Sequence, residues 1–402
     1  MVSRPNIRFK GYTDDWEQRK LSDVAGVYDG VHQTPAYQDE GIMFLSVENI
    51  ATLTSEKYIS EEAYDRDYKV RPEKGDILMT RIGDVGTPNV VETSEKLAYY
   101  VSLALLKPKG IDSYFLNNAI QSSSFQHGLR ERTLLTAIPM KINKDEIGKV
   151  DISYPTNNDE QRKIGESFKQ LDNLIILHQR KCDDTKELKK YMLQKMFPKN
   201  VEKRPEIRFE GFTDDWEQRE LTEISDIVTG TTPPTKDKDN YGGDRLFVSP
   251  ADIQGNRYVD ETTTTLTEKG YALGRELRGG ATLFVSIGST IGKVAQIKES
   301  ATTNQQINAV IPYDEMDDDF VFTMLENEAD KIRKLSATQA VPIINKTTFG
   351  ETEVRFPKKD EQKRIGEYFS NLDNLITLHQ RKCDELKEVK KYMLQNMFPG
   401  RD

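Results

Sequence analysis

Short segments of the sequence that are bounded by glycine or proline are rich in hydrogen-bonding side chains. The clearest segment is TNQQIN at residues 303–308, in which Asn304, Gln305 and Gln306 follow one another. Asparagine and glutamine can pair in bidentate fashion with adenine in the major groove of DNA, and the threonine methyl group suits thymine. Such segments are candidates for reading base edges, although polar strand edges also occur in proteins that bind no nucleic acid.

Two further segments with this chemistry occur once in each half of the chain. GDILMTRIGDVG at 75–86 corresponds to GATLFVSIGSTIG at 280–292, and residues 133–155 correspond to 336–357. The glycines of the first pair could equally be simple turn residues. The candidate DNA-contacting residues are Gln33, Thr34, Arg81, Asp84, Thr133, Thr136, Lys141, Asn143, Thr231, Thr232, Ser286, Ser289, Thr290, Asn304, Gln305, Gln306, Thr338, Gln339, Asn345 and Lys346.

The sequence carries no catalytic motif beside these residues. A GxxxxGK[ST] phosphate-binding loop is missing, and no GxGxxG follows a strand in a βαβ unit. The N-P-P-[FY] and D-P-P-Y motifs expected of an amino-methyltransferase are missing too. The adjacent pairs Asp14–Asp15 and Asp214–Asp215 could form a metal site, but a solvated turn before a tryptophan anchor is the simpler interpretation. We therefore expect no catalytic residue and no bound metal or cofactor in this chain.

The two cysteines, Cys182 and Cys383, occupy the same position in two copies of a repeat. His178 and His379 follow the same repeat. A metal site is one interpretation, but these residues form no cluster with ligand-like spacing. Packing along a helix is the interpretation that we favour.

Two blocks of sequence occur twice. Residues 4–21 return at 204–221 with 14 of 18 positions identical, and 159–198 return at 360–399 with 30 of 40 identical. Between them, residues 22–158 and 222–359 have similar lengths but greatly different sequences. Uniform drift would not leave one region nearly identical beside another that is almost unrecognisable. The repeat therefore indicates shared machinery alternating with two domains that have different tasks.

Each variable domain is predicted to be α+β with a strand-rich core. Runs such as 42–47, 99–108, 245–250 and 307–312 are rich in β-branched and aromatic residues and are bounded by turn formers. Helical stretches are expected at 113–131 and 317–335.

The second repeated block predicts a long helix after each variable domain. Residues 160–196 lack internal proline and consist mainly of good helix formers, with Asp159 as a candidate N-cap and Pro198 as the stop. A heptad pattern places Ile164, Leu171 and His178 at one seam position, and Leu174 and Leu188 at the other. We expect the two helices to pair as an antiparallel coiled coil and to relate the halves by a pseudo-twofold axis.

These expectations divide the chain into four parts. They are residues 1–158 as a first recognition domain, 159–198 as a first helix, 199–359 as a linker with a second recognition domain, and 360–402 as a second helix. The net charge of −9 is unusual for a nucleic-acid binder, but binding depends on local patches. No apolar run could span a bilayer and the first residues lack a signal-peptide core, so we expect a cytoplasmic protein.

With these motifs, the chain resembles the specificity subunit of type I restriction–modification systems. The resemblance covers nearly the whole chain and rests on two variable domains, on LTEISDIVTGTTPP, FVSIGSTIGKV and TNQQINAVIP, and on the E-Q-[RK]-[RK]-I start of each helix. The first domain departs from the family pattern, because GVYDGVHQTP replaces the usual Gly–Thr–Pro loop and no Asn–Gln pair follows its central strands.

The resemblance implies a non-catalytic targeting subunit. Each variable domain would read one half of an asymmetric, bipartite site in double-stranded DNA. The helices would space the half-sites and bind two methyltransferase subunits, and two restriction–motor subunits would complete a complex that uses S-adenosylmethionine, ATP and Mg. The helix residues expected to bind partners are Phe168, Leu171, Leu174, Leu188, Met192, Phe369, Leu372, Leu375, Val389 and Met393.

Other functions remain open on the sequence alone. A stand-alone DNA-binding regulator would bind its operator without a partner. A nuclease or methyltransferase in its own right would need a motif that the sequence lacks. A coiled-coil scaffold would explain the helices but not the two divergent strand-rich domains.

Overall fold

The computed structural model describes residues 4–199, 201–336 and 342–400. The chain forms two compact units, Met1–Leu177 with Lys382–Asp402, and His178–Arg381. We call them unit 1 and unit 2. Each unit contains one variable domain, the first part of the long helix that follows this domain, and the last part of the other long helix.

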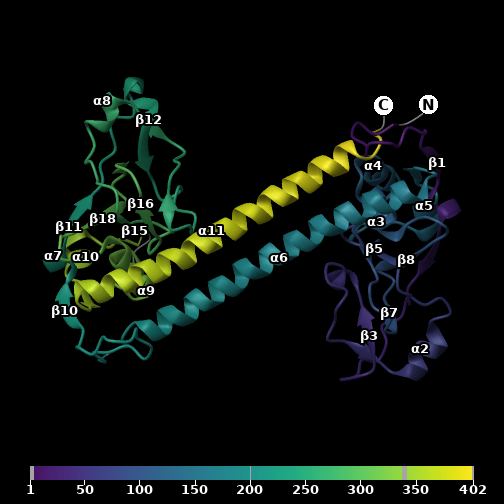
Figure 1. The fold of residues 1–402 in the computed structure, drawn as a ribbon, viewed down its shortest axis with the longest axis horizontal. Helices are drawn as coiled ribbons and strands as arrows, with labels where there is room; N and C mark the ends of the chain where they lie inside the picture. Colours follow the sequence, from purple (N-terminus) through teal and green to yellow (C-terminus); the bar gives the residue numbers. More distant parts are fainter. Residues whose placement is uncertain (1–3, 200, 337–341, 401–402) are drawn as a thin grey trace. The chain divides into compact units, whose positions relative to one another are not determined.

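Unit 1 is built around an antiparallel sheet of four strands in the order β2-β8-β5-β6 (Figure 1). A second sheet, β4-β3-β7, and a strand pair, β1-β9, complete it. The elements are β1 (Glu17–Lys20), α1 (Leu21–Val24), β2 (Ala25–Asp29), β3 (Ile42–Leu45), η1 (Val47–Asn49), β4 (Tyr58–Ile59), α2 (Glu61–Asp67), β5 (Ile77–Thr80), β6 (Pro88–Val90), β7 (Leu97–Tyr99), β8 (Leu103–Pro108), α3 (Ser113–Gln121), α4 (Ser123–Arg132), α5 (Lys144–Gly148), β9 (Asp151–Tyr154) and α6 (Asn158–Met196).

Unit 2 repeats this plan with a five-stranded sheet in the order β11-β18-β15-β16-β13, against which α9 packs (Figure 1). A smaller sheet, β14-β12-β17, and the pair β10-β19 accompany it. The elements are β10 (Glu217–Glu220), α7 (Leu221–Ile224), β11 (Ser225–Thr229), η2 (Lys238–Asn240), β12 (Tyr241–Val248), β13 (Tyr258–Val259), β14 (Thr265–Leu266), α8 (Glu268–Tyr271), β15 (Thr282–Val285), β16 (Val294–Ile297), β17 (Thr302–Thr303), β18 (Ile307–Pro312), α9 (Asp318–Arg333), α10 (Lys346–Gly350), β19 (Glu353–Phe356) and α11 (Lys359–Asn396).

The central strands β5 and β15 are buried along their whole length because both faces of each sheet are covered. In β5, Ile77 and Met79 contribute to the core that contains α3 and the start of α6, whereas Leu78 faces the core under the smaller sheet. Alternate residues of a strand point to opposite faces, so one strand supplies both cores. The predicted α+β, strand-rich domains are confirmed.

The repeated residues at the start of each long helix are structural. Glu160 is fully buried and accepts hydrogen bonds from Arg8 at 2.6 and 2.8 Å, and Glu361 is paired with Arg208 in the same way. The neighbouring Gln161 accepts from the backbone N–H of Asp112, the residue that caps α3. The helix start therefore ties the N-terminal block and α3 together, which explains why these residues are repeated.

The N-cap of α6 differs from the expectation. The helix begins at Asn158, and the Asn157 side chain accepts hydrogen bonds from the backbone N–H groups of Asp159 and Glu160. Asn157, one of the strongly preferred capping residues, therefore takes the role that the sequence analysis gave to Asp159.

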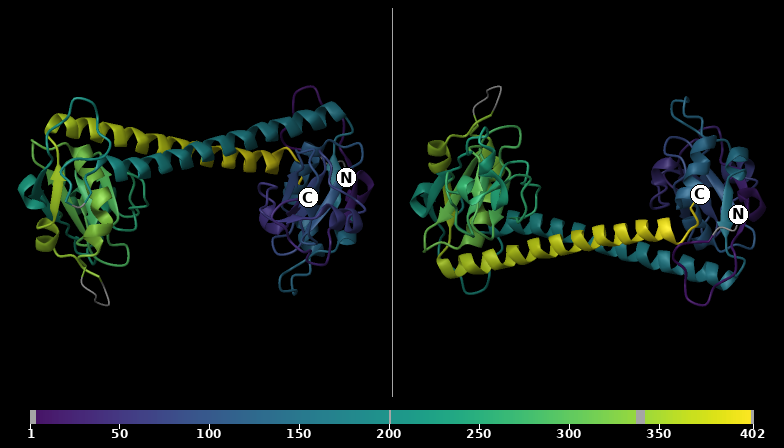
Figure 2. Two further views of the ribbon diagram at one scale, coloured as in Figure 1. Left: turned by 90° about the horizontal axis from the view of Figure 1, so that it is seen from below. Right: turned by 90° about the horizontal axis from the view of Figure 1, so that it is seen from above.

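Within each unit the two long helices lie side by side and antiparallel (Figure 2). In unit 2, Nδ1 of His178 lies 3.0 Å from Nδ1 of His379, and Nζ of Lys189 lies 2.6 Å from Oδ1 of Asp373. In unit 1, Lys390 binds Asp172 at 2.7 Å. The predicted antiparallel pairing is confirmed, and the histidines meet as packing partners on the seam.

One of the two predicted seam positions is displaced by one residue. Leu174 and Leu188 are 43% and 44% exposed, whereas Cys182 is buried and Lys189 is only 8% exposed. Seam residues therefore recur at alternating spacings of four and three, through Ile175, His178 and Cys182 and onward. The seam keeps a seven-residue repeat but shows a different face of the helix to its partner.

An aromatic residue at the end of each helix closes the core of the unit formed around the other repeat. Phe398, which follows α11, packs against Trp16, Phe115 and Phe168 in unit 1. Phe197, which follows α6, packs in the same way against Trp216, Phe320 and Phe369 in unit 2. We call these two residues the core plugs. Trp16 and Trp216 anchor the repeated TDDWEQR segments in these cores, as the sequence predicted.

Unit 2 has a buried ionic cluster that the corresponding residues of unit 1 do not form. Lys189 lies 2.6 Å from both Asp373 and Glu326, and Arg257 lies 3.2 Å from Asp373. Burial raises the pKa of Glu326, and the nearby Lys189 opposes this effect. The equivalent pair in unit 1, Lys390 and Asp172, is more exposed, with the Asp172 side chain 36% exposed.

This difference predicts unequal effects of equivalent substitutions. Asp373→Ala would leave two buried cations without their shared partner and should cost about 3 kcal/mol of unfolding free energy. Asp172→Ala should cost less than about 1 kcal/mol, because its ion pair is partly solvated. Chemical denaturation of the two variants checks the difference, and equal losses would argue against a stabilising role for the cluster.

None of the described helices combines the length and the apolar character that crossing a membrane requires.

Candidate functional site

The polar segments of unit 2 converge at one edge of its central sheet. Strands β11 and β15 end there and β18 begins there, so the loops that follow or precede them are neighbours. Backbone hydrogen bonds fasten these loops: Thr231 donates to Thr303, Ser286 donates to Gln306, and Gly288 donates to Pro342. We call this region, with residues 230–234, 286–292, 303–306 and 342–346, the loop edge of unit 2.

Unit 1 has an equivalent loop edge, made of residues 30–34, 81–87, 100–102 and 133–144. Val31 bridges to Tyr100, and Ile82 bridges to Lys141. The backbone N–H of Gly83 donates to Met140 at 2.9 Å. Thus, in each unit, segments that are far apart in the sequence meet at one edge of the central sheet. A surface that reads DNA with several loops requires this arrangement.

In unit 2 the amide side chains of the loop edge hold one another in place. Asn304 donates to Oε1 of Gln306 at 3.0 Å, and its own Oδ1 accepts from the backbone N–H of Gln306. The Thr232 hydroxyl donates to Oε1 of Gln305 at 2.5 Å. These amides are half-buried or exposed and pre-ordered, which lowers the entropic cost of binding.

The other predicted residues of this edge vary in exposure. Ser289 and Lys346 are exposed, whereas Thr231 and Thr290 are half-buried. Asn345 is exposed, but its side chain caps α10 by accepting from the backbone N–H of Thr348. Thr338 and Gln339 lie outside the described residues.

In unit 1 most of the predicted residues are exposed on the loop edge: Gln33, Thr34, Asp84, Thr136, Lys141 and Asn143. Thr133 is half-buried, and its hydroxyl donates to the carbonyl of Leu129. Gln33 and Thr34 line a groove of about 810 Å³. Which of these side chains contact bases stays a prediction.

Two of the predicted DNA contacts belong to the scaffold. Arg81 is 5% exposed, and its guanidinium donates to Asp29 and to the carbonyl of Ile142. Ser286 is 2% exposed, and its hydroxyl accepts from the side-chain amide of Asn308. Their polar groups are already satisfied inside the protein, so both residues hold the loops instead of reaching DNA.

The loop edge of unit 1 also carries apolar side chains that our sequence analysis overlooked. Leu135 is 62% exposed and Ile138 is fully exposed, and Leu134 and Met140 lie nearby with about half their surface free. Apolar side chains can contact thymine methyl groups. Their cluster in TLLTAIPM was visible in the sequence, but only the threonines there were selected.

The long helices leave apolar side chains exposed at equivalent positions. Leu174, Leu177, Leu188 and Tyr191 on α6 correspond to Leu375, Leu378, Val389 and Tyr392 on α11, and each is between 43% and 57% exposed. At 100° per residue, the four positions of each helix fall within an arc of about 100°. We call Leu174, Leu177, Val389 and Tyr392 the helix patch of unit 1, and Leu188, Tyr191, Leu375 and Leu378 the helix patch of unit 2.

The helix patches change the list of expected partner contacts. Leu174, Leu188, Leu375 and Val389 are available, but Phe168 and Phe369 are fully buried and Leu372 is 6% exposed. The latter three belong to the cores of the units. Leu171, Met192 and Met393 are partly buried against the same cores. Leu177, Leu378 and the two tyrosines were missed, because they do not fall at the predicted heptad positions, although Leu174 and Leu188 on the same face do.

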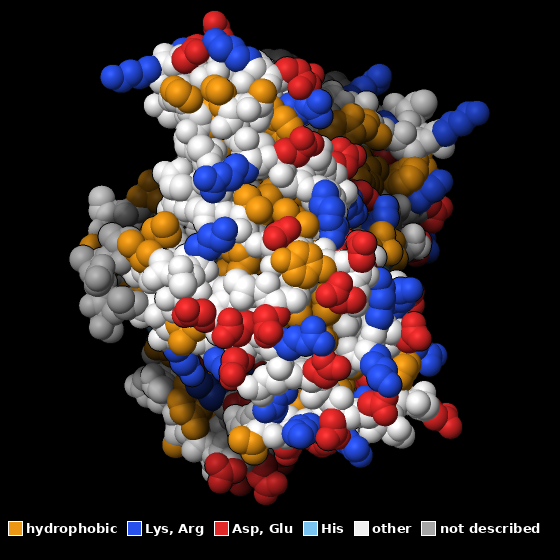
Figure 3. Space-filling model, turned by 90° about the vertical axis from the view of Figure 1, so that its left-hand side faces the viewer, with side chains coloured by type: hydrophobic (Ala, Val, Ile, Leu, Met, Phe, Trp, Pro, Cys, Tyr) orange, Lys and Arg blue, Asp and Glu red, His pale blue; other side chains and the backbone are white. Residues whose placement is uncertain are grey.

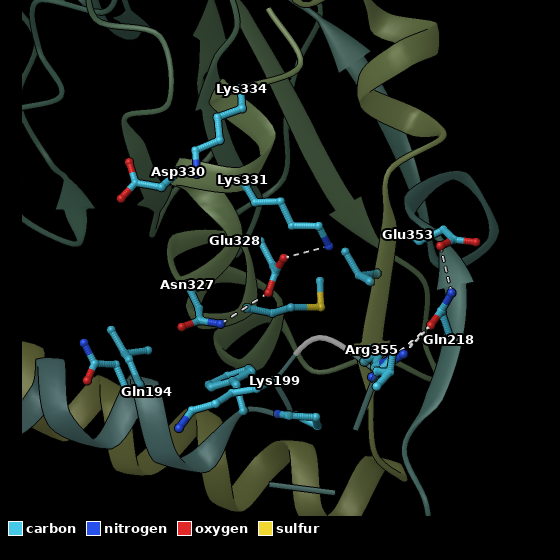
Figure 4. Close-up of a pocket in the computed structure, with 16 residues that line it drawn as sticks. Gln194, Lys199, Gln218, Asn327, Glu328, Asp330, Lys331, Lys334, Glu353 and Arg355 are labelled. Atoms are coloured by element: carbon cyan, nitrogen blue, oxygen red, sulfur yellow. Dashed lines mark hydrogen bonds and ion pairs between the residues drawn. The ribbon is translucent and has the colours of Figure 1, made fainter. Parts of the chain in front are cut away.

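A cavity of about 880 Å³ lies in unit 2 between α9, the β10-β19 pair and the end of α6 (Figure 4). Its charged groups are largely paired: Glu328 with Lys331 at 3.2 Å, Glu353 with Gln218 at 2.8 Å, and Arg355 with Gln218. None of the residues selected from the sequence lines this cavity. The paired charged groups that line it do not include a nucleophilic side chain hydrogen-bonded to a general base.

The described residues contain no group of three or more histidine, cysteine or acidic side chains that could hold a metal ion. The aspartates of the repeated TDDWEQR segments have arginine partners, since Arg4 binds Asp15 at 2.6 Å and Arg204 binds Asp215 at 2.7 Å. The simpler interpretation of these aspartates, a solvated turn, accounts for the contacts that they make.

A family model supplies the decisive comparison. The type I restriction modification DNA specificity domain matches residues 13–186 and again residues 213–388. The chain belongs to this family. The family resemblance and the tandem arrangement predicted from the sequence are thereby confirmed.

Relatives within the family agree with the assignment. The specificity subunit of the type I restriction enzyme MjaIX from Methanocaldococcus jannaschii is 25% identical, over 46% of this chain and 44% of the relative. The HindI specificity subunit from Haemophilus influenzae is 27% identical, over 46% and 41%. Each of these matches therefore spans less than half of the relative. The putative MjaX specificity subunit of M. jannaschii is 22% identical over 96% of this chain and 94% of the relative.

The fold has a counterpart among solved structures. The S subunit of a type I restriction–modification system from M. genitalium matches 99% of this chain and 100% of that chain, with a TM-score of 0.75 and 14% sequence identity. At this identity the match concerns the fold.

Proposed function

We propose that this chain is a non-catalytic subunit that recognises an asymmetric, bipartite site in double-stranded DNA. One observation carries the proposal: two loop edges with different side chains stand on domains of the same plan, and each domain packs against nearly identical N-terminal and helical segments. The shared plan suggests that both edges meet the same kind of ligand, and different side chains suggest that they read different sequences. Joining two modest readers in one chain also raises the affinity of the whole.

The helix patches extend the proposal to partners. Two equivalent apolar surfaces suit two identical protein partners, and we propose that these are methyltransferase subunits. Two restriction–motor subunits would join the complete complex. S-adenosylmethionine, ATP and Mg would then be bound by those partners and not by this chain. The long helices have 39 and 38 residues, which corresponds to about 58 Å each, and would set the spacing of the half-sites.

An exchange of the first variable domain tests the recognition proposal. Residues 22–158 are replaced by those of a related specificity subunit, the chimera is expressed with its methyltransferase, and the methylated motif is determined by methylome sequencing. One half of the motif should change and the other half should stay. A change in both halves, or in neither, would refute modular reading. Sequence-specific binding by the chain alone, with no methylation, would favour a stand-alone regulator.

A further inference from the structure

A lysine at the loop edge is identical in the two variable domains although these domains have otherwise diverged. The triplet Ile142–Asn143–Lys144 of unit 1 reappears as Ile344–Asn345–Lys346 in unit 2. Each triplet leads into a five-residue helix, α5 or α10, that starts at the lysine and ends at a glycine.

The two triplets occupy the same place in the fold. The backbone N–H of Ile142 donates to the carbonyl of Arg81 at 3.0 Å, and that of Ile344 donates to Ser286 at 2.9 Å. Arg81 and Ser286 directly follow the central strands β5 and β15. Each triplet is thus fixed to the end of a central strand, at the centre of its loop edge.

Structural roles explain the isoleucines but not the lysines. Ile142 and Ile344 are buried in the cores, with exposures of 0% and 2%. Both lysines are exposed, and neither has a carboxylate partner among the described residues. Lys144 also lines the groove that holds Gln33 and Thr34. The cations therefore lie beside the proposed reading residues and are not neutralised by the protein.

We propose that Lys144 and Lys346 bind the phosphate backbone of DNA, one in each half-site, without reading sequence. This inference rests on the proposed function. A side chain that is the same in two domains with different targets cannot carry the difference between them. The feature common to all half-sites is the phosphate backbone, and contacts to it position a protein while base contacts specify the sequence.

The charge distribution makes such contacts valuable. The chain has a net charge of −9, and acidic and basic side chains are intermixed on the face of unit 2 drawn in Figure 3. Long-range attraction by the whole protein is therefore weak, and individual unpaired cations at the loop edges must supply the phosphate-dependent part of binding.

Salt titration of DNA binding tests the proposal. Lys144→Gln, Lys346→Gln and the double variant are assembled with the methyltransferase. Affinities are measured for a duplex with the methylated motif and for a scrambled duplex, over about 50 to 200 mM salt. Each single substitution should weaken binding to both duplexes equally, by about three- to tenfold, and should lower the salt slope by about 0.9. The double variant should show twice the change in slope.

Matched variants separate position from charge. Lys10→Gln and Lys363→Gln remove the same charge from exposed lysines outside the loop edges and should leave the slope unchanged. Lys144→Arg and Lys346→Arg should retain it. An unchanged slope in both glutamine variants, or an altered methylation motif, would overturn the inference while the proposed function stands. If the wild-type complex does not distinguish the two duplexes, the proposed function itself fails.

Discussion

Replacing Phe398 by alanine is expected to destabilise unit 1 by about 3–5 kcal/mol, the usual cost of removing a buried phenylalanine from a core. Its side chain is 3% exposed and its ring lies 5.6–6.0 Å from those of Trp16, Phe115 and Phe168. The resulting cavity would lie where three elements of unit 1 meet, so relaxation cannot fill it cheaply.

The equivalent substitution, Phe197→Ala, should act on unit 2 instead. Hydrogen exchange resolves the two effects: Phe398→Ala should raise exchange in α3, and Phe197→Ala should raise it in α9. Tyr392→Ala is a suitable control, because this side chain is 57% exposed and its loss should cost less than about 0.5 kcal/mol. Destabilisation of the opposite unit by either variant would contradict the assignment of the core plugs.

Aspartate substitutions in one helix patch are expected to remove one methyltransferase subunit from the assembled complex. A carboxylate buried at an apolar interface pays a desolvation penalty without a partner, so an affinity loss of about 100-fold or more is expected at that patch. Leu375→Asp with Leu378→Asp targets unit 2, and Leu174→Asp with Leu177→Asp targets unit 1.

Native mass spectrometry counts the bound partners. The wild type should carry two methyltransferase subunits, each double variant one, and the quadruple variant none. Circular dichroism provides the control, since the four leucines are exposed at 43–49% and the fold should persist. A full complement of partners on the quadruple variant would exclude the helix patches as docking surfaces.

The strands and long helices were predictable because their signals are local. Runs such as ILMT and TLFV are apolar except for one threonine each, and burial on both faces of a sheet is the reason. The smaller sheets were not foreseen as separate layers, because the parallel pairing of β3 with β7, or of β12 with β17, joins segments more than 50 residues apart.

The helix seam was misplaced for a chemical reason. Leucine is the usual seam residue, so Leu174 and Leu188 were preferred to Cys182 and Lys189. Yet Lys189 is buried because Asp373 and Glu326 neutralise it, and Cys182 packs opposite the backbone of Ile376. Pairing partners on other elements decide which face is buried, and a single helix sequence does not contain that information.

The candidate DNA contacts were found by residue type, and their accessibility depended on tertiary structure. Asn304 and Gln306 do lie on a loop edge. Arg81 and Ser286 are buried instead, because Arg81 binds Asp29, which is 52 residues away in the sequence, and Ser286 binds Asn308, which is 22 residues away. Lys144 was not among the candidates, although the Ile–Asn–Lys triplet that contains it is repeated at 344–346. The repeated Ile–Asn–Lys triplet, together with the equivalent backbone hydrogen bonds of Ile142 and Ile344, shows that Lys144 and Lys346 occupy one position in the fold.

The core plugs have a consequence for the order in which the protein is made. A ribosome releases residues from the N-terminus onward, so the variable domain of unit 1 emerges first. Its core nevertheless needs Met397 and Phe398, which are translated only after all of unit 2. Unit 2 has all of its residues as soon as 381 has been released. Unit 1, whose variable domain is synthesised first, is therefore completed after unit 2. A chain truncated just before Met397 would keep a finished second unit together with a first unit whose core stays open to proteases and chaperones.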